Sequence, residues 1–212
     1  MSGRQQVGLE DQRIIPLATP ADDRQCDALV EGLLQGGIPV VEVALRAEPA
    51  LAAIARIARR GDVAVGAGTV LSVDQAQRTV DHGASFLVTP GFDEAVVRWA
   101  VDAGVPIIPG VMTPSEIQAA RGLGLRRLKL FPAGLLGGTR ALDAYGAVFR
   151  DVRFMPSGGV TQDTLRAHLA HPAVFAVSGS WMTNTAMLTA GAAAVARAAA
   201  AARGILREID AA

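Results

Sequence analysis

Lysine and cysteine are almost absent from this chain of 212 residues. Its lysines and arginines together number 20, yet Lys129 is the only lysine, and Cys26 is the only cysteine. A lone cysteine excludes an internal disulfide, which agrees with a reducing cytoplasm. We expect Cys26 to be a small core residue of a helix.

The chain also lacks net charge and long apolar runs. Its 20 acidic residues balance the 20 basic ones, so no overall field favours nucleic acid or an anionic membrane surface. No apolar run reaches the roughly 18 residues of a membrane-spanning helix, and the opening residues MSGRQQVGLEDQR contain no apolar signal region. These features favour a cytoplasmic protein with a small-molecule partner.

Short β-branched runs alternate with amphipathic stretches along the whole chain. The expected strands are residues 14–18, 40–45, 63–67, 86–89, 105–109, 127–131, 152–156 and 174–178. Eight such units predict an α/β fold, a single-domain (β/α)₈ TIM barrel over residues 1–212, with residues 1–13 as an N-terminal extension or short helix. A doubly wound open sheet is the alternative, but no G-x-G-x-x-G follows the first strand. The alanine-rich residues 190–210 are expected to form the closing helix and to pack on the barrel.

Lys129 lies in the apolar run RLKLF, residues 127–131. Because side chains alternate along a strand, Lys129 and Phe131 share one face while Leu128 and Leu130 share the other. The leucines suit contact with helices, which directs Lys129 into the interior near the usual active-site end of a barrel. A buried amine loses its charge more readily and becomes nucleophilic, whereas a guanidinium stays protonated. Lys129 is therefore a candidate to form an imine with a carbonyl substrate; a lysine that extends to the solvent at the barrel mouth or only pairs with an acid is the alternative.

The strand VVEVALR, residues 40–46, carries a second unusual charge. A glutamate in the middle of a parallel strand is costly unless it is paired or used. By the same alternation, Glu42 faces the interior, where it could meet Lys129 and move protons during imine chemistry or only orient the lysine. Arg46, near the strand end, has a planar guanidinium suited to a substrate carboxylate, although a solvated surface charge is the alternative.

Glycine-rich turns follow the seventh and eighth expected strands, where barrels commonly bind phosphate through backbone N–H groups. The predicted phosphate-binding residues are Ser157, Gly158, Gly159, Gly179 and Ser180. Tight turns alone are the alternative explanation.

Two further strand ends contribute to the predicted site. Thr69, in GAGTV, offers a hydroxyl beside Arg46, and Pro90, in VTPG, is expected to shape the pocket wall. The three histidines, His82, His168 and His171, lack a convincing metal-ligand arrangement and are expected at solvated helix ends. Imine chemistry requires neither a metal nor a cofactor.

These residues occur within a longer series of motifs. The series runs from about residue 14 to the C-terminus through GGIPVVEVALR, VGAGTVL, FLVTPG, VPIIPGVMTPSE, LKLFPA, RFMPSGGV and VSGSW. It resembles the 2-keto-3-deoxy-6-phosphogluconate (KDPG) and 4-hydroxy-2-oxoglutarate (KHG) aldolases, a class I pyruvate-aldolase family.

The resemblance implies a role for each matching residue. It makes Lys129 the imine-forming residue and Glu42 the proton shuttle, while Arg46 and Thr69 bind the pyruvyl end. Gly158, Gly159 and Ser180 match the residues that hold the substrate phosphate. Pro90 and Phe131 are expected to line the pocket.

The resemblance also implies a homotrimer that cleaves KDPG to pyruvate and D-glyceraldehyde 3-phosphate in the Entner–Doudoroff route or a relative of it. Three segments depart from the family pattern: SGGV replaces TGGI, SGSW replaces GGSW, and AGLLGG replaces a polar loop. The last change leaves the released aldehyde open.

Several other functions remain compatible with the same residues. A KHG or 2-keto-3-deoxy-6-phosphogalactonate aldolase would use the same lysine with a different aldehyde. A noncatalytic phosphosugar-binding barrel would use Lys129 only to pair with its ligand. A barrel isomerase would use Glu42 as a base without an imine.

Overall fold

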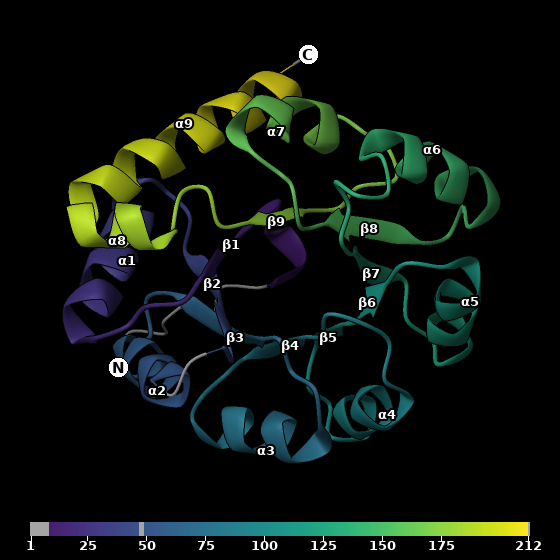
Figure 1. The fold of residues 1–212 in the computed structure, drawn as a ribbon, viewed down its shortest axis with the longest axis horizontal. Helices are drawn as coiled ribbons and strands as arrows, with labels where there is room; N and C mark the ends of the chain where they lie inside the picture. The colour runs from purple at the N-terminus through teal and green to yellow at the C-terminus, as the bar shows by residue number, and fades with distance from the viewer. Residues whose placement is uncertain (1–8, 47–48, 212) are drawn as a thin grey trace.

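The computed structural model describes residues 9–46 and 49–211, except for the side chain of Glu10. Short strands curl around an interior and helices lie outside them (Figure 1). The strands are β1 (Ile14–Ala18), β2 (Val40–Ala44), β3 (Ala64–Gly68), β4 (Phe86–Val88), β5 (Ile107–Ile108), β6 (Gly110–Val111), β7 (Arg127–Leu130), β8 (Arg153–Pro156) and β9 (Val177–Gly179). The helices are α1 (Asp23–Gln35), α2 (Ala50–Arg60), α3 (Val73–Asp81), α4 (Glu94–Asp102), α5 (Pro114–Gly122), α6 (Thr139–Val148), α7 (Gln162–Leu169), α8 (Thr185–Ala190) and α9 (Ala192–Asp210).

Each of the eight regions in which the sequence predicts a strand contains one. Residues 1–8 of the expected N-terminal extension lie outside the described residues, and Leu9–Asp11 forms a short 3₁₀ helix. None of the helices in the described ranges is long and apolar enough to cross a membrane.

All paired strands are parallel and form two sheets, in the orders β5-β4-β3-β2-β1-β9 and β6-β7-β8. Pro109 separates β5 from β6, and its carbonyl accepts a hydrogen bond of 2.8 Å from the Lys129 N–H. At the other junction, Phe154 of β8 forms an isolated parallel bridge with Val174. A curled parallel sheet with its helices on the outer side confirms the α/β class (Figure 1). Closure into a full (β/α)₈ barrel stays a prediction.

Side-chain capping starts several of the outer helices. The side chains of Asp22, Ser72, Asp93 and Asn184 each accept a hydrogen bond from a backbone N–H of the following first turn. Such caps satisfy N–H groups that have no partner within the helix, so they locate the helix starts just after the strand ends.

The alanine-rich segment forms α9, as expected, with the short α8 before it. Its small residues pack closely against α1: a Cβ on Gly32 would overlap Val195, and one on Gly36 would overlap Ala199. The two helices approach at positions where neither has a bulky side chain. The packing of α1 on α9 therefore places the first and last long helices of the described chain side by side (Figure 1).

Candidate active site

Lys129 and Glu42 form a buried ion pair inside the curled sheet. Lys129 is 4% exposed and Glu42 is 0% exposed. The Nζ atom of Lys129, on β7, lies 3.3 Å from Oε1 of Glu42, on β2. This confirms that strand alternation directs both side chains to the interior, where they meet.

Glycines on β3 leave the space that this pair occupies. In the strand register Glu42 pairs with Gly66, and Ala44 pairs with Gly68. A Cβ on Gly68 would overlap the Glu42 carboxylate, and a Cβ on Gly66 would overlap the ring of Phe86. The β3 strand therefore borders the pair with backbone only, which suits the close approach of a ligand.

Phe131 connects the lysine to the first glycine turn. Its ring centroid lies 5.4 Å from Lys129 Nζ, within the range of a cation–π contact. A Cβ on Gly158 would lie 3.0 Å from the Phe131 ring. The aromatic ring thus lies close to both the amine and the turn predicted to bind phosphate.

The turn after β8 has the backbone conformation of an anion-binding loop. Gly158 and Gly159 have φ values of 79° and 87°, which favour glycine. The carbonyls of Ser157 and Gly158 each accept a 2.8 Å hydrogen bond, from the N–H groups of Ala133 and Gly134 respectively. The Gly158 and Gly159 N–H groups donate to no acceptor within the described part of the chain. Two adjacent free donors of this kind suit a phosphate.

The turn after β9 lies beside this loop. A Cβ on Gly179 would overlap the ring of Trp181 and lie 3.3 Å from the carbonyl oxygen of Val160. Ser180 is exposed, whereas Ser157 is buried and its N–H donates to the Leu130 carbonyl. The exposed hydroxyl of Ser180 therefore suits ligand binding better than Ser157 does.

Thr69 has the one positive φ, 59°, among the non-glycine residues in the described ranges. A β-branched residue is strained in this region, and such strain is concentrated at functional sites. Thr69 follows β3 directly and is half-buried. Pro90 is also half-buried, and its carbonyl lies where a Cβ on Gly110 would be. Both residues thus follow the carboxyl ends of their strands, β3 and β4. The contact of Thr69 with a ligand beside Arg46 and the place of Pro90 in the pocket wall stay predictions.

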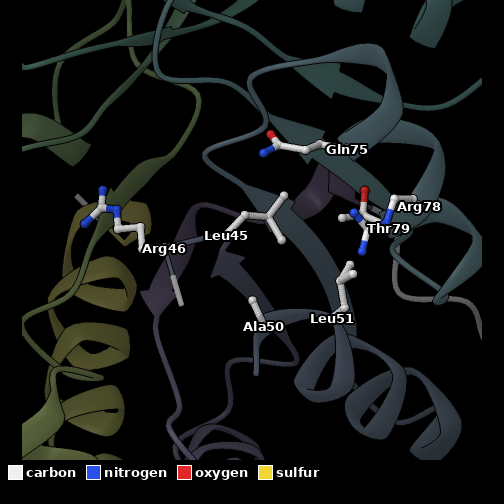
Figure 2. Close-up of a pocket in the computed structure, with 7 residues that line it drawn as sticks. All are labelled: Leu45, Arg46, Ala50, Leu51, Gln75, Arg78 and Thr79. Atoms are coloured by element: carbon white, nitrogen blue, oxygen red, sulfur yellow. The ribbon is translucent and has the colours of Figure 1, made fainter. Parts of the chain in front are cut away.

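Arg46 is exposed, two residues beyond the end of β2. Within residues 9–46 and 49–211 its guanidinium makes no hydrogen bond or ion pair. It borders an open pocket between α2 and α3, lined also by Leu45, Ala50, Leu51, Gln75, Arg78 and Thr79. Figure 2 shows the guanidinium directed away from Gln75 and Arg78. Arg46 thus has no partner among the described residues, and the structure does not bring it into contact with Lys129 or Glu42.

Two polar residues of the interior were not predicted from the sequence. The Oγ atom of Ser178, on β9, donates to Oε2 of Glu42 at 3.2 Å. Thr89 Oγ1 donates to the Gly91 carbonyl at 2.6 Å and accepts from the Gly110 N–H at 3.1 Å, next to the break between β5 and β6. The alternation rule, applied to V-S-G on β9, could have identified Ser178.

The expectation that all three histidines lie at solvated helix ends is wrong for His168. It is 6% exposed, and its Nδ1 lies 2.8 Å from the Thr164 carbonyl. His171 is largely buried and lies 3.1 Å from Asp143, whereas His82 is exposed. Among the described residues, histidine, cysteine, aspartate and glutamate form no group of three or more that could hold a metal ion.

Comparison with known proteins identifies the family. The family model described as "KDPG and KHG aldolase" matches residues 6–198. The 2-dehydro-3-deoxy-phosphogluconate aldolase of Treponema pallidum is 43% identical over 184 residues, which are 86% of this chain and 88% of that protein. The KHG/KDPG aldolase of Escherichia coli K12 is 36% identical over 179 residues, 84% of each chain.

A solved structure agrees with the sequence relatives. The KDPG aldolase of Legionella pneumophila, with pyruvate captured at low pH as a covalent carbinolamine intermediate, has a TM-score of 0.88 and 31% identity. The alignment covers 91% of this chain and 95% of that one. With a family model matching most of its length and relatives of this identity, the chain belongs to the KDPG and KHG aldolase family.

Proposed function

We propose that this protein is a class I aldolase that cleaves KDPG to pyruvate and D-glyceraldehyde 3-phosphate. One observation carries the proposal. The only lysine of the chain, Lys129, is buried, and its Nζ lies 3.3 Å from Oε1 of the buried Glu42. Family membership and the carbinolamine captured in the Legionella relative support it. A noncatalytic phosphosugar-binding protein is not favoured, because the relatives are named aldolases.

The pair provides the two groups that imine chemistry requires. The neutral Lys129 amine adds to the C2 ketone, and loss of water gives a protonated imine. The C3–C4 bond then breaks: its electron pair forms the C2=C3 bond of an enamine, and the imine π pair moves to nitrogen. Glu42 accepts the C4 hydroxyl proton as the aldehyde leaves. Glu42 later returns a proton to C3, and hydrolysis of the imine releases pyruvate and regenerates the amine.

Two anchors on either side of the pair would hold the substrate. Arg46 and Thr69 bind the carboxylate end, since an exposed guanidinium can form bidentate bonds with a carboxylate. The turns after β8 and β9 bind the phosphate through backbone N–H groups and a hydroxyl. The phosphate-binding residues are Ser157, Gly158, Gly159, Gly179 and Ser180. Pro90 and Phe131 form walls between the anchors.

The proposal includes the assembly and the compartment. Residues 1–212 form one domain in which the two sheets close into a (β/α)₈ barrel, and the backbone bonds across Pro109 and Phe154 support closure. The family resemblance supports a homotrimer. A single cysteine, unable to form an internal disulfide, is consistent with the cytoplasm.

Borohydride reduction with pyruvate tests the imine directly. Because Lys129 is the only lysine, one reduced adduct on the peptide that contains it identifies the reacting amine without competing side chains. We expect this adduct with pyruvate and borohydride together, and none in Lys129→Arg. An unmodified Lys129 peptide would favour a binding protein. Aldolase activity should vanish in Lys129→Arg, whereas an isomerase using Glu42 as its base would tolerate this change.

A second candidate substrate is KHG, because the 36%-identical Escherichia coli relative is named a KHG/KDPG aldolase. Both substrates would use Lys129 and Glu42, but KHG has no phosphate for the glycine turns. Steady-state kcat/KM values on KDPG, its galactonate-series isomer and KHG decide among them. We expect KDPG to be preferred and Ser180→Ala to reduce cleavage of KDPG more than cleavage of KHG.

A further inference from the structure

Ser178 is a buried hydroxyl that no step of the proposed reaction uses. It is 0% exposed and lies in the middle of β9. The β1 strand lies between β9 and β2, with Ile15 paired to Ser178 and Leu17 paired to Glu42. The stagger of the parallel strands thus carries the Ser178 side chain across β1 to Glu42, 136 residues away in the chain.

The two oxygens of the Glu42 carboxylate have different partners. Oε1 lies 3.3 Å from Lys129 Nζ, and Oε2 accepts the Ser178 hydroxyl hydrogen bond at 3.2 Å. The backbone of Gly68 closes a third side, since a Cβ there would overlap the carboxylate. The carboxylate is therefore held in one orientation, with one oxygen directed at the reacting amine.

We propose that Ser178 is a positioning residue, which holds Glu42 in the orientation that exchanges protons with the substrate bound to Lys129. This inference rests on the proposed function. A hydroxyl both donates and accepts, so Ser178 donates to the carboxylate and accepts from the carboxylic acid. Ammonium groups only donate, and Lys129 must lose its proton before its amine can add to the ketone. Ser178 is thus the partner that keeps Glu42 oriented throughout the cycle.

Exchange of the pyruvate methyl protons with D₂O isolates the proton-transfer step. In the pyruvate imine the C3–H bond breaks, its electron pair forms the C2=C3 bond, the imine π pair moves to nitrogen and the proton passes to Glu42. Return of a deuteron from the solvent-equilibrated acid labels the methyl group, which NMR follows. We expect Ser178→Ala to slow this exchange and kcat by about 10- to 100-fold. Borohydride trapping at Lys129 and KM should stay close to wild type.

Thr183→Val is the matched control. Thr183 is also buried, and its Oγ1 donates to the Leu17 carbonyl of β1 at 2.7 Å, but it does not contact Glu42. This variant removes a buried hydroxyl from the same region and should exchange at the wild-type rate. Ser178→Cys replaces the hydroxyl by a slightly larger thiol that is a weaker donor, so it should slow exchange even if Ser178→Ala folds poorly.

The outcomes separate this inference from the function on which it rests. Absence of a borohydride adduct in the wild type would overturn the aldolase proposal. An adduct in the wild type together with wild-type exchange in Ser178→Ala or Ser178→Cys would overturn only the role of Ser178. Equal losses in Ser178→Ala and Thr183→Val would also overturn it, because they would indicate a general structural effect.

Discussion

The carboxylate of Glu42, on β2, fills the space beside Gly68 on the neighbouring strand β3, where a Cβ of residue 68 would lie. Gly68 has no positive φ, so alanine is compatible with its backbone but not with the position of Glu42. The glycine is thus required by packing against Glu42 rather than by backbone conformation.

The Gly68→Ala variant should therefore lose activity by displacing Glu42. We expect kcat to fall about 100-fold, because a proton-transfer group is moved by a fraction of its hydrogen-bond length. Overpacking should also lower the free energy of unfolding by about 1–3 kcal/mol. Gly122→Ala, in α5 with no atom near its Cβ position, is the control. It should keep kcat unchanged and raise stability by up to about 1 kcal/mol. Wild-type kcat in Gly68→Ala would contradict the assigned role of Glu42.

The buried pair of Lys129 and Glu42 should contribute a large interaction term to the free energy of unfolding. Lys129→Met leaves the Glu42 carboxylate buried without its cation, so we expect a loss of about 3 kcal/mol in urea unfolding. Lys129→Met with Glu42→Gln removes both charges and should be more stable than Lys129→Met alone. The stability losses of Lys129→Met and Glu42→Gln are also measured separately. If their sum equals the loss in the double variant to within about 0.5 kcal/mol, the pair contributes no interaction energy.

Close packing of α1 on α9 should make Gly32 sensitive to a single methyl group. A Cβ on Gly32 would lie 2.5 Å from Val195 Cβ and 2.7 Å from the Ala192 carbonyl, so Gly32→Ala should lower stability by about 1–3 kcal/mol. Gly204→Ala, on α9 with open space at its Cβ position, should raise it by about 0.5–1 kcal/mol. The midpoints of urea unfolding measure both effects: Gly32→Ala reports the packing clash, and Gly204→Ala reports helix propensity alone. Equal shifts would rule out the tight contact.

Glu116 should stabilise the start of α5 only when it is ionised. Burial acts to raise its pKa, but hydrogen bonds from the N–H groups of Met112 and Thr113 and from the Thr113 hydroxyl outweigh this, and the pKa is lowered. A lowered pKa contributes stability above the ordinary value of 4.5, and this contribution is lost as the pH falls through the lowered value.

Glu116→Gln should accordingly be about 1 kcal/mol less stable than wild type at pH 7. The difference should narrow below about pH 4, because glutamine resembles the protonated acid. Urea unfolding at both pH values checks this. A constant difference for Glu116→Gln would contradict the hydrogen-bonded carboxylate.

Cys26 should be unreactive in the folded protein. Burial, with a smaller contribution from the Asp23 carboxylate, raises its pKa to about 11, so little thiolate exists near neutral pH. Iodoacetamide at pH 7.5 should label the folded chain at least about 100-fold more slowly than the urea-unfolded chain, as followed by mass spectrometry. Rapid labelling of the folded chain would show that α1 opens readily.

Strand alternation accounts for the success of the central predictions. It depends on only a few neighbouring residues, so RLKLF and VVEVALR were sufficient to direct Lys129 and Glu42 inward. Strand limits were less predictable because they depend on partners. Residues 174–176 were expected in the last strand, but Val174 bridges Phe154 and β9 begins at Val177. Pro109 ends β5 because it has no N–H to donate.

The prediction failed for His168 because burial is a property of the packed chain. A polar residue near a helix end is usually solvated, but His168 lies next to Gly138 of the loop before α6. Ser178 was missed for a related reason. A serine carries no charge that would be costly inside a strand, and its partner lies two strands away.

The sequence by itself determined the order of strands and helices, the inward direction of Lys129 and Glu42, and the motifs of the family. These properties depend on residue type and short-range periodicity. Only the tertiary structure decided that the Glu42 oxygens contact Lys129 and Ser178, that Gly68 leaves room for the carboxylate, and that Arg46 is exposed beyond the end of β2. These contacts join strands that are distant in the chain, and their distances follow from strand stagger and packing, which no local pattern specifies.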